Sequence, residues 1–286
     1  MPELPEVETM RRGVLPIVGS RIESVTRPPC TRRPIAMTPR IDHLHRRLAG
    51  RTVVDVARRG KRVMIVVDDD QRLVIEPRMT GIVLLADPPT EDHLRLRLNL
   101  TGRGHDRVLF WDRRGLGTVR LYRDDEFQKT IDRRLGPDAM DVDGETLRTR
   151  LGSSRRAVKV ALLDQTAVAG IGNMYAAEIL FLAGVDPRTR CDKLSRPQWR
   201  RIADHTIGLL AEAIRHEGST LSDGTYRNAL NDPGGFQNYH RVYDRAGLTC
   251  DRCDAAEIRR IVQAQRSTFF CATCQRRTGL HPAVST

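Results

Sequence analysis

The segment CDRCDAAEIRRIVQAQRSTFFCATC, residues 250–274, contains two Cys-x-x-Cys pairs separated by 17 residues. This separation falls within the range of about 15–20 residues typical of a four-cysteine zinc site. Four thiolates close a tetrahedral shell and leave no open position, so we expect one structural Zn²⁺ rather than a catalytic one. A redox dithiol would need a single pair in a βαβ context. The expected ligands are Cys250, Cys253, Cys271 and Cys274.

Between the two pairs, apolar residues alternate from Ile258 to Phe270. This alternation predicts two short strands joined by a turn around residues 264–267, with Arg266 at the tip. The segment 241–286 carries eight arginines and four acidic residues, a net charge of +4. Such an excess suits contact with a phosphate backbone, although an arginine at a hairpin tip is ordinarily just solvated.

Upstream of the zinc segment the sequence changes character twice. Runs rich in β-branched and alternating apolar residues, among them residues 51–56, 62–67 and 93–100, predict an antiparallel sandwich preceded by one helix. From about residue 146 the apolar spacing becomes helical. The fold class is therefore α+β and multidomain. The expected segments are a β-sandwich domain (1–130), a linker (131–144), a helical domain (145–240) and a zinc finger (241–286).

The composition favours a polyanionic partner. The formal net charge is +12, and of the 48 basic residues only four are lysines, which leaves 44 arginines. Arginine suits bidentate phosphate contact. The acidic, proline-broken N-terminus does not resemble a signal peptide, and no apolar stretch is long enough for a membrane span. We therefore expect a cytoplasmic protein that does not interact with a membrane.

The N-terminal segment Met1–Glu8 reads MPELPEVE. Removal of Met1 would leave Pro2 with a free secondary amine, whose pKa lies about two units below that of lysine. An unprotonated amine beside the carboxylic acid of Glu3 suits covalent attack on a carbon that becomes an iminium. A purely structural interpretation also fits, in which Pro5 and the glutamates favour the start of a helix.

Three segments resemble the formamidopyrimidine-DNA glycosylases, a family of the bacterial Fpg/Nei superfamily that excises oxidised purines. They are PELPEVET (2–9), GIGNMYAAEIL (170–180) and QRSTFFCATCQ (265–275). The resemblance implies a β-sandwich, a helix–two-turns–helix domain and a terminal zinc finger. It also implies a bifunctional DNA glycosylase and AP lyase of base excision repair, which acts as a monomer on double-stranded DNA with oxidised bases or abasic sites and associates with the nucleoid.

The same resemblance implies the roles of individual residues. Pro2 is the nucleophile and Glu3 the general acid, while Glu6 and Glu178 support the active site. Four residues are implied to contact the lesion or DNA phosphates, namely Lys61, Arg266, Lys159 and Asn173. Residue patterns alone are less specific here: Lys61 lies in a charged turn that is ordinarily solvated, and the GIGN turn predicts Asn173 as a helix N-cap.

Flipping a base leaves a hole in the base stack that side chains must fill. The resemblance assigns this wedge to Met79, Arg114 and Leu116. Two departures from the family occur: Leu116 replaces a phenylalanine and loses aromatic stacking, and Glu76-Pro77 replaces a His-Leu pair. From residues alone, Met79 could equally pack in a core. The resemblance also implies that the polar segment 218–237 folds over the everted base.

Two alternatives remain at this level. One is an endonuclease VIII-like glycosylase for oxidised pyrimidines, although Leu4 and Val7 favour the purine branch. The other is a zinc-ribbon DNA-binding protein without catalytic activity, in which Pro2 is incidental.

Overall fold

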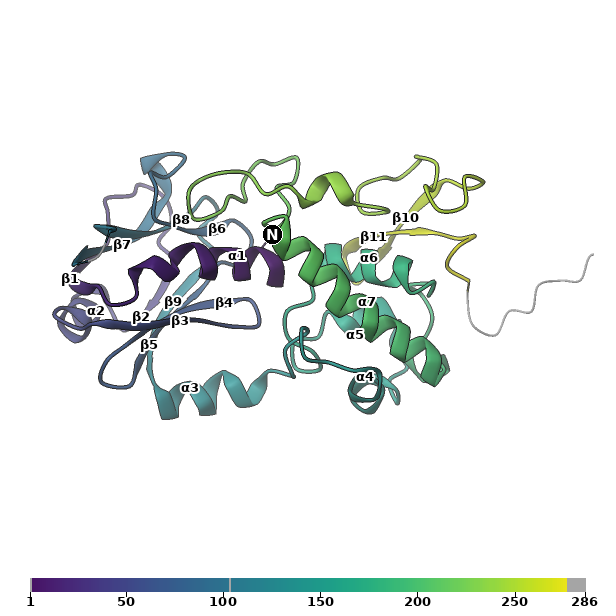
Figure 1. Ribbon diagram of the computed structural model, residues 1–286, viewed down its shortest axis with the longest axis horizontal. Helices are drawn as coiled ribbons and strands as arrows, with labels where there is room; N and C mark the ends of the chain where they lie inside the picture. The colour runs from purple at the N-terminus through teal and green to yellow at the C-terminus, as the bar shows by residue number, and fades with distance from the viewer. Residues whose placement is uncertain (1, 103, 277–286) are drawn as a thin grey trace, which may run out of the picture. The chain divides into compact units, whose positions relative to one another are not determined.

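The computed structural model describes residues 2–102 and 104–276 (Figure 1). Met1, whose removal the sequence predicts, and the last residues of the predicted zinc finger, 277–286, lie outside the described residues. The chain forms two compact units. The first comprises Met1–Arg134 and Ala213–Gln237, and the second comprises Leu135–Glu212 and Asn238–Thr286.

Two β-sheets form the body of the first unit. One has the strand order β1-β7-β8-β6 and the other β2-β9-β5-β4-β3. Neighbouring strands are antiparallel except β2 and β9, which are parallel. The strands are β1 (Arg21–Thr26), β2 (Ala36–Thr38), β3 (Val53–Arg59), β4 (Arg62–Val67), β5 (Gln71–Glu76), β6 (Gly81–Leu84), β7 (Leu94–Thr101), β8 (Arg107–Asp112) and β9 (Thr118–Arg123).

Helix α1 (Leu4–Val14) completes the core of this unit, as the sequence predicts. Its Val7, Met10 and Val14 are fully buried in the same hydrophobic cluster as Ile65 of β4 and Leu98 of β7. These three positions lie on one face because a helix repeats every 3.6 residues. Burial of that face therefore fixes α1 against both sheets.

Shorter elements close the edges of the first unit. They are the helices α2 (Ile41–Leu48) and α3 (Asp124–Thr130) and the 3₁₀ turns η1 (Leu15–Ile17), η2 (Glu91–His93) and η3 (Asp132–Arg134). The segment 213–237 also belongs here, although in sequence it follows helices of the second unit. Its Ala229 accepts a hydrogen bond from the Leu85 N–H at 2.9 Å and is buried in the core.

Helices and one hairpin form the second unit, which matches the predicted order of helices before a zinc finger. Helix α7 ends in the first unit and η5 begins in it, because that unit includes Ala213–Gln237. The elements are α4 (Gly144–Leu151), α5 (Val158–Leu162), α6 (Asn173–Leu182), η4 (Cys191–Lys193), α7 (Arg196–Arg215), η5 (Phe236–Tyr239), β10 (Ile258–Gln263) and β11 (Arg266–Cys271). Strands β10 and β11 pair antiparallel.

A glycine inside α1 allows segment 213–237 to approach the helix. A Cβ atom on Gly13 would lie 2.4 Å from the Cβ of Ala229. We therefore predict that Gly13→Ala destabilises the protein by about 1–3 kcal/mol, the range for overpacking a core. Helix propensity alone would have the opposite effect, because it favours alanine over glycine by about 1 kcal/mol.

The matched control is Gly208→Ala in α7, where an added Cβ would meet no atom within 4 Å. This variant should gain up to about 1 kcal/mol. Urea unfolding of the two variants measures both changes. Equal stabilisation by both substitutions would contradict the close approach of residue 229 to α1.

Candidate active site and DNA-binding residues

The Glu6 carboxylate joins the start of α1 to the segment 218–237. One of its oxygens, Oε2, accepts the Glu3 N–H at 2.8 Å, and Oε1 accepts the Ser219 N–H at 2.9 Å. Glu3 and Glu6 are 2% and 1% exposed, and Pro2 is buried as well. A buried carboxylate is stable only when hydrogen bonds compensate its lost hydration, so these two N–H groups are held firmly in place. Glu6 thus positions the backbone that carries both candidate catalytic residues.

Segment 218–237 is held by its own polar side chains. Gly218 has φ +75°, and a Cβ there would lie 2.8 Å from Glu6 Oε1, so this close approach requires glycine. The Tyr226 hydroxyl donates to the Glu217 carbonyl at 2.9 Å, and Thr220 Oγ1 donates to the Tyr226 carbonyl at 2.7 Å. The sequence did not indicate the contact of Ser219 with Glu6, and the glycine before it was the only local signal.

The three predicted wedge residues lie on two loops of the first unit. Met79 is in the loop between β5 and β6, where it is half-buried. Arg114 and Leu116 are in the loop between β8 and β9. The Leu116 side chain is 44% exposed, which suits insertion into a base stack.

The departure at Glu76-Pro77 has a local structural consequence. The Glu76 carboxylate forms ion pairs with Arg62 at 3.2 Å and with Arg78 at 2.9 Å. It therefore links β4 to the loop that carries Met79. Lys61 immediately precedes Arg62 in the β3–β4 turn, where Gly60 has φ +55°. The role of Lys61 in contacting DNA stays a prediction.

In the second unit, Lys159 and Asn173 converge on the hairpin. The Lys159 ammonium donates to Asn173 Oδ1 and, at 3.5 Å, to the Ser267 carbonyl, to which Asn173 Nδ2 also donates at 3.0 Å. The Lys159 side chain is fully buried. Ser267 adjoins the exposed Arg266, so three of the predicted phosphate-binding residues lie close together. Whether Lys159 itself contacts a phosphate stays a prediction.

Two local predictions in this region were wrong. Asn173 is the first residue of α6 and not its N-cap, which is Gly172 without a side-chain cap, because the Asn173 amide is engaged by Lys159 and Ser267. Arg266 is the first residue of β11 and not the hairpin tip. The tip is Ala264-Gln265, with φ values of +45° and +60°, as a tight two-residue turn requires.

Glu178 anchors the segment that leads into the zinc finger. Its fully buried carboxylate accepts the N–H groups of Arg241, Val242 and Tyr243 at 2.8–3.1 Å. Burial raises the pKa of Glu178 above its usual value, while these backbone hydrogen bonds oppose the rise. The geometry makes Glu178 a structural anchor between α6 and residues 241–243, and its support of the active site stays a prediction.

The four predicted zinc ligands lie together. Their sulfur atoms all lie within 4.8 Å of one another, and the pairs Cys250–Cys274 and Cys253–Cys271 are each 3.8 Å apart. A tetrahedral site with Zn–S bonds of about 2.3 Å requires sulfur–sulfur distances of about 3.8 Å. The donor set therefore fits one Zn²⁺ with no open position. Cys250 and Cys271 also share a hydrophobic cluster with Ala177 and Phe181 of α6, which extends the small core of the finger.

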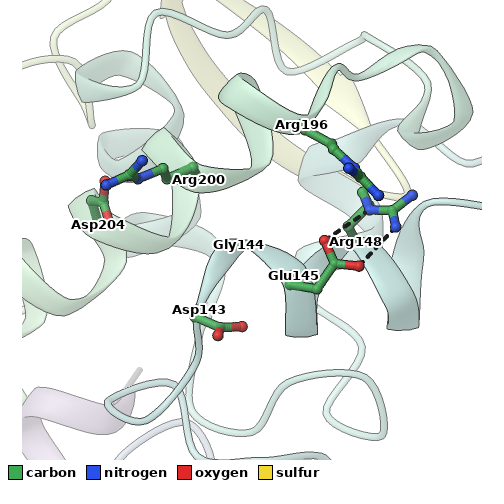
Figure 2. A pocket seen from close by; sticks show the side chains of 7 residues that line it. All are labelled: Asp143, Gly144, Glu145, Arg148, Arg196, Arg200 and Asp204. Carbon is green, nitrogen blue, oxygen red and sulfur yellow. Dashed lines mark hydrogen bonds and ion pairs between the residues drawn. The ribbon is translucent and has the colours of Figure 1, made fainter.

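A separate cavity of about 330 Å³ lies between α4 and α7 (Figure 2). None of the predicted site residues lines it. The Glu145 carboxylate pairs with Arg148 at 2.7 Å, and Arg200 lies 4.0 Å from Asp204. Three arginines face three carboxylates, so this cavity lacks the excess positive charge of a nucleic-acid site. The lining residues are Asp143, Gly144, Glu145, Arg148, Arg196, Arg200 and Asp204.

Comparison with known protein families assigns the class. The formamidopyrimidine-DNA glycosylase N-terminal domain matches residues 1–119, and the H2TH domain of the same family matches residues 135–225. The zinc finger found in FPG and IleRS matches residues 247–277. The chain belongs to the formamidopyrimidine-DNA glycosylase family, and the predicted fold, family and zinc finger are confirmed.

Individual relatives agree with this assignment over almost the whole chain. The formamidopyrimidine-DNA glycosylases of Chloroflexus aurantiacus and Laribacter hongkongensis are each 39% identical and cover 96% of this chain, which spans 98% and 100% of their lengths. The crystal structure of MutM (FPG) from Thermus thermophilus has a TM-score of 0.83 and 36% identity, and the match covers 96% of this chain and 98% of that one. Lactococcus lactis Fpg in complex with DNA containing an abasic site has a TM-score of 0.85 and 34% identity, with 96% and 100% coverage.

No helix in the described part of the chain is both long and apolar enough to cross a membrane.

We predict that Cys271→Ser releases the zinc ion, because three thiolates leave the tetrahedral shell open. Zinc per protein, measured by atomic emission after dialysis, should fall from one to near zero. Proteolysis within residues 250–274 should become faster. The matched control is Cys191→Ser, the same substitution at a buried cysteine outside the four-sulfur cluster. A full zinc content in the Cys271→Ser protein would contradict the assigned ligand set.

The buried imidazole of His240 should make the stability of the protein depend on pH. The side chain is 7% exposed, and burial together with Arg241 lowers the pKa of His240 to about 4. Since an unfolded histidine titrates near 6.5, His240 stabilises the fold above pH 6.5, and this contribution is lost as pH falls toward 4. Between pH 7.5 and 5.0 the loss is roughly 2 kcal/mol.

The His240→Phe variant retains a ring against Tyr243, whose ring centroid lies 5.7 Å from that of His240, and removes the titration. Urea unfolding at the two pH values, with zinc held constant, should show a smaller loss for the variant than for the wild type. An identical pH dependence in both proteins would contradict the burial of a neutral imidazole.

Proposed function

We propose that this protein excises oxidised purines such as 8-oxoguanine and formamidopyrimidines from duplex DNA and then cleaves the strand at the abasic site, with Pro2 as the nucleophile. The observation that supports the proposal most strongly is the family match over nearly the whole chain, with Pro2 and Glu3 directly before α1. Among the similar structures, Lactococcus lactis Fpg is bound to DNA that contains a Fapy-dG or an abasic site.

In the proposed reaction, the lone pair of the Pro2 nitrogen attacks C1′ of the deoxyribose. The bond from C1′ to the base breaks and the base leaves with its electron pair and a proton. Glu3 then protonates the ring oxygen as the C1′–O4′ bond opens, which leaves a cationic iminium between Pro2 and C1′. A secondary amine forms this iminium with no N–H proton to lose, so the positive charge persists.

The iminium acidifies the protons on C2′. Loss of one proton expels the 3′ phosphate by β-elimination, and a second elimination expels the 5′ phosphate, so the strand is cleaved on both sides. Water finally hydrolyses the iminium and regenerates the amine. This sequence uses no redox step, and the zinc ion takes no part in it because its shell is closed.

DNA binding is assigned to residues of both units. Phosphates are contacted by Lys61, Lys159, Asn173 and Arg266, and Met79, Arg114 and Leu116 fill the space left by the everted nucleotide. The segments 145–240 and 241–286 act as the helical and zinc-finger DNA-binding modules, and 1–130 carries the chemistry. We infer that the protein works at the nucleoid, where its substrate is.

Covalent trapping tests the proposal. Borohydride added during incubation with an 8-oxoguanine duplex should reduce the iminium and leave a stable protein–DNA adduct at Pro2, located by peptide mass spectrometry. Glu3→Gln should lower single-turnover excision by about 10²–10⁴-fold, the usual contribution of a general acid. The matched control is Glu23→Gln, the same substitution at an exposed position of β1, which should leave the rate unchanged.

Three results would contradict the proposal: no adduct, an adduct of unchanged yield in Pro2→Gly, or full activity in protein whose intact mass shows that Met1 is retained. A thymine-glycol duplex tested in parallel separates excision of purines from that of pyrimidines.

A further inference from the structure

The two loops that carry the wedge residues are neighbouring crossovers between the two sheets. The first leaves β5 at Glu76 and enters β6 at Gly81, and the second leaves β8 at Asp112 and enters β9 at Thr118. At one end Glu76 is paired with Thr118 in one sheet, and at the other Gly81 is paired with Asp112 in the other sheet. The loops are therefore side by side and fixed at both ends.

Two buried side chains connect these loops. The Thr80 hydroxyl donates to Asp112 Oδ1 and accepts the Arg114 N–H at 2.9 Å. The other Asp112 oxygen, Oδ2, accepts the Gly117 N–H at 2.8 Å. Thr80 is 2% exposed and Asp112 is fully buried. Met79 thus adjoins the hydroxyl that holds the backbone of Arg114, and both ends of the Arg114–Leu116 loop rest on this pair.

The surrounding packing leaves little room for another arrangement. A Cβ on Gly117 would lie 2.6 Å from the Phe110 ring and 3.1 Å from Asp112 Oδ2. From the other side, the buried Arg95 donates through Nε to the Asp112 carbonyl at 2.9 Å and through Nη1 to the Arg33 carbonyl at 3.1 Å. Buried polar groups that are fully hydrogen-bonded make a rigid and uniquely defined structure.

We propose that Thr80 and Asp112 are positioning residues that lock the Met79 loop and the Arg114–Leu116 loop into a single rigid wedge. This inference rests on the proposed function. The wedge must enter the base stack as the nucleotide swings out, so its two parts have to arrive together. If these hydrogen bonds are lost, the two loops move independently. The wedge then no longer stabilises the state in which the base lies outside the stack.

The chemistry of the two residues makes the proposal specific. The carboxylate accepts at both oxygens, from Thr80 and from Gly117, whereas an asparagine would turn an NH₂ group toward one of these donors. The threonine hydroxyl donates and accepts at once, which serine can do and valine cannot. Thr80→Val and Asp112→Asn should therefore break the lock, and Thr80→Ser should preserve it.

The test compares two substrates in single-turnover reactions. On an 8-oxoguanine duplex, which requires eversion of a stacked base, Thr80→Val and Asp112→Asn should be slower by about 10–100-fold, as for a misplaced catalytic geometry. On a duplex with a preformed abasic site, where there is no base to unstack, borohydride trapping should slow by less than about 3-fold. Thr80→Ser should stay within about 3-fold of wild type on both.

The matched control is Thr206→Val in α7, which also removes a fully buried hydroxyl, bonded to the Ile202 carbonyl at 2.7 Å. It should lose thermal stability without changing the ratio of the two rates. If Thr80→Val does not fold, Asp112→Asn and Thr80→Ser decide the matter.

An equal loss on both substrates, or no loss on either, would overturn the lock while wild-type trapping still supported the proposed function. A wild-type protein that neither excises nor traps would instead overturn the proposed function, and the lock with it.

Discussion

One buried carboxylate, that of Glu6, determines where the proposed catalytic residues Pro2 and Glu3 lie. It accepts the N–H of Glu3 and the N–H of Ser219, two groups separated by 216 positions in the sequence. A buried charge without such partners would be too costly to keep, so the position of each segment depends on the other. Residues Pro2–Glu3 and the start of the polar segment 218–237 therefore form one structural element, although no secondary structure joins them.

The same physical device recurs at two other irregular segments. Asp112 holds the loop that carries Arg114, and Glu178 holds residues 241–243 before the zinc finger. The backbone of such segments has no neighbouring strand with which to form hydrogen bonds. A carboxylate, which only accepts hydrogen bonds, can satisfy several N–H groups at once. Each carboxylate is buried, so the segments are fixed from the interior while side chains such as Arg114 and Leu116 stay exposed.

The sequence predicted those features that are encoded locally. The cysteine spacing indicated the zinc site, and alternation of leucines from residue 94 to residue 100 indicated β7. The sequence did not predict four strands, namely β1, β2, β6 and β9; β2 has only three residues and β6 only four, and β9 is polar at both ends. It also missed the pairing of Thr80 with Asp112, since two ordinary polar residues 32 positions apart carry no joint signal. The prediction that Asn173 is a helix N-cap was wrong for a related reason. Its side chain hydrogen-bonds to Ser267, which lies 94 positions away in the sequence.

The departures from the family pattern at residues 76–77 and 116 lie outside the hydrogen bonds that hold the two loops. Leu116 is exposed, and Glu76 forms ion pairs with Arg62 and Arg78 at the edge of β5. Neither takes part in the hydrogen bonds among Thr80, Asp112 and Gly117. The tip of the wedge can therefore vary in size and polarity while its base keeps one geometry. Under the proposed function, discrimination of the opposite base depends on the tip, and the covalent chemistry depends on Glu6 and the residues it positions. The two properties can evolve separately because different buried carboxylates support them.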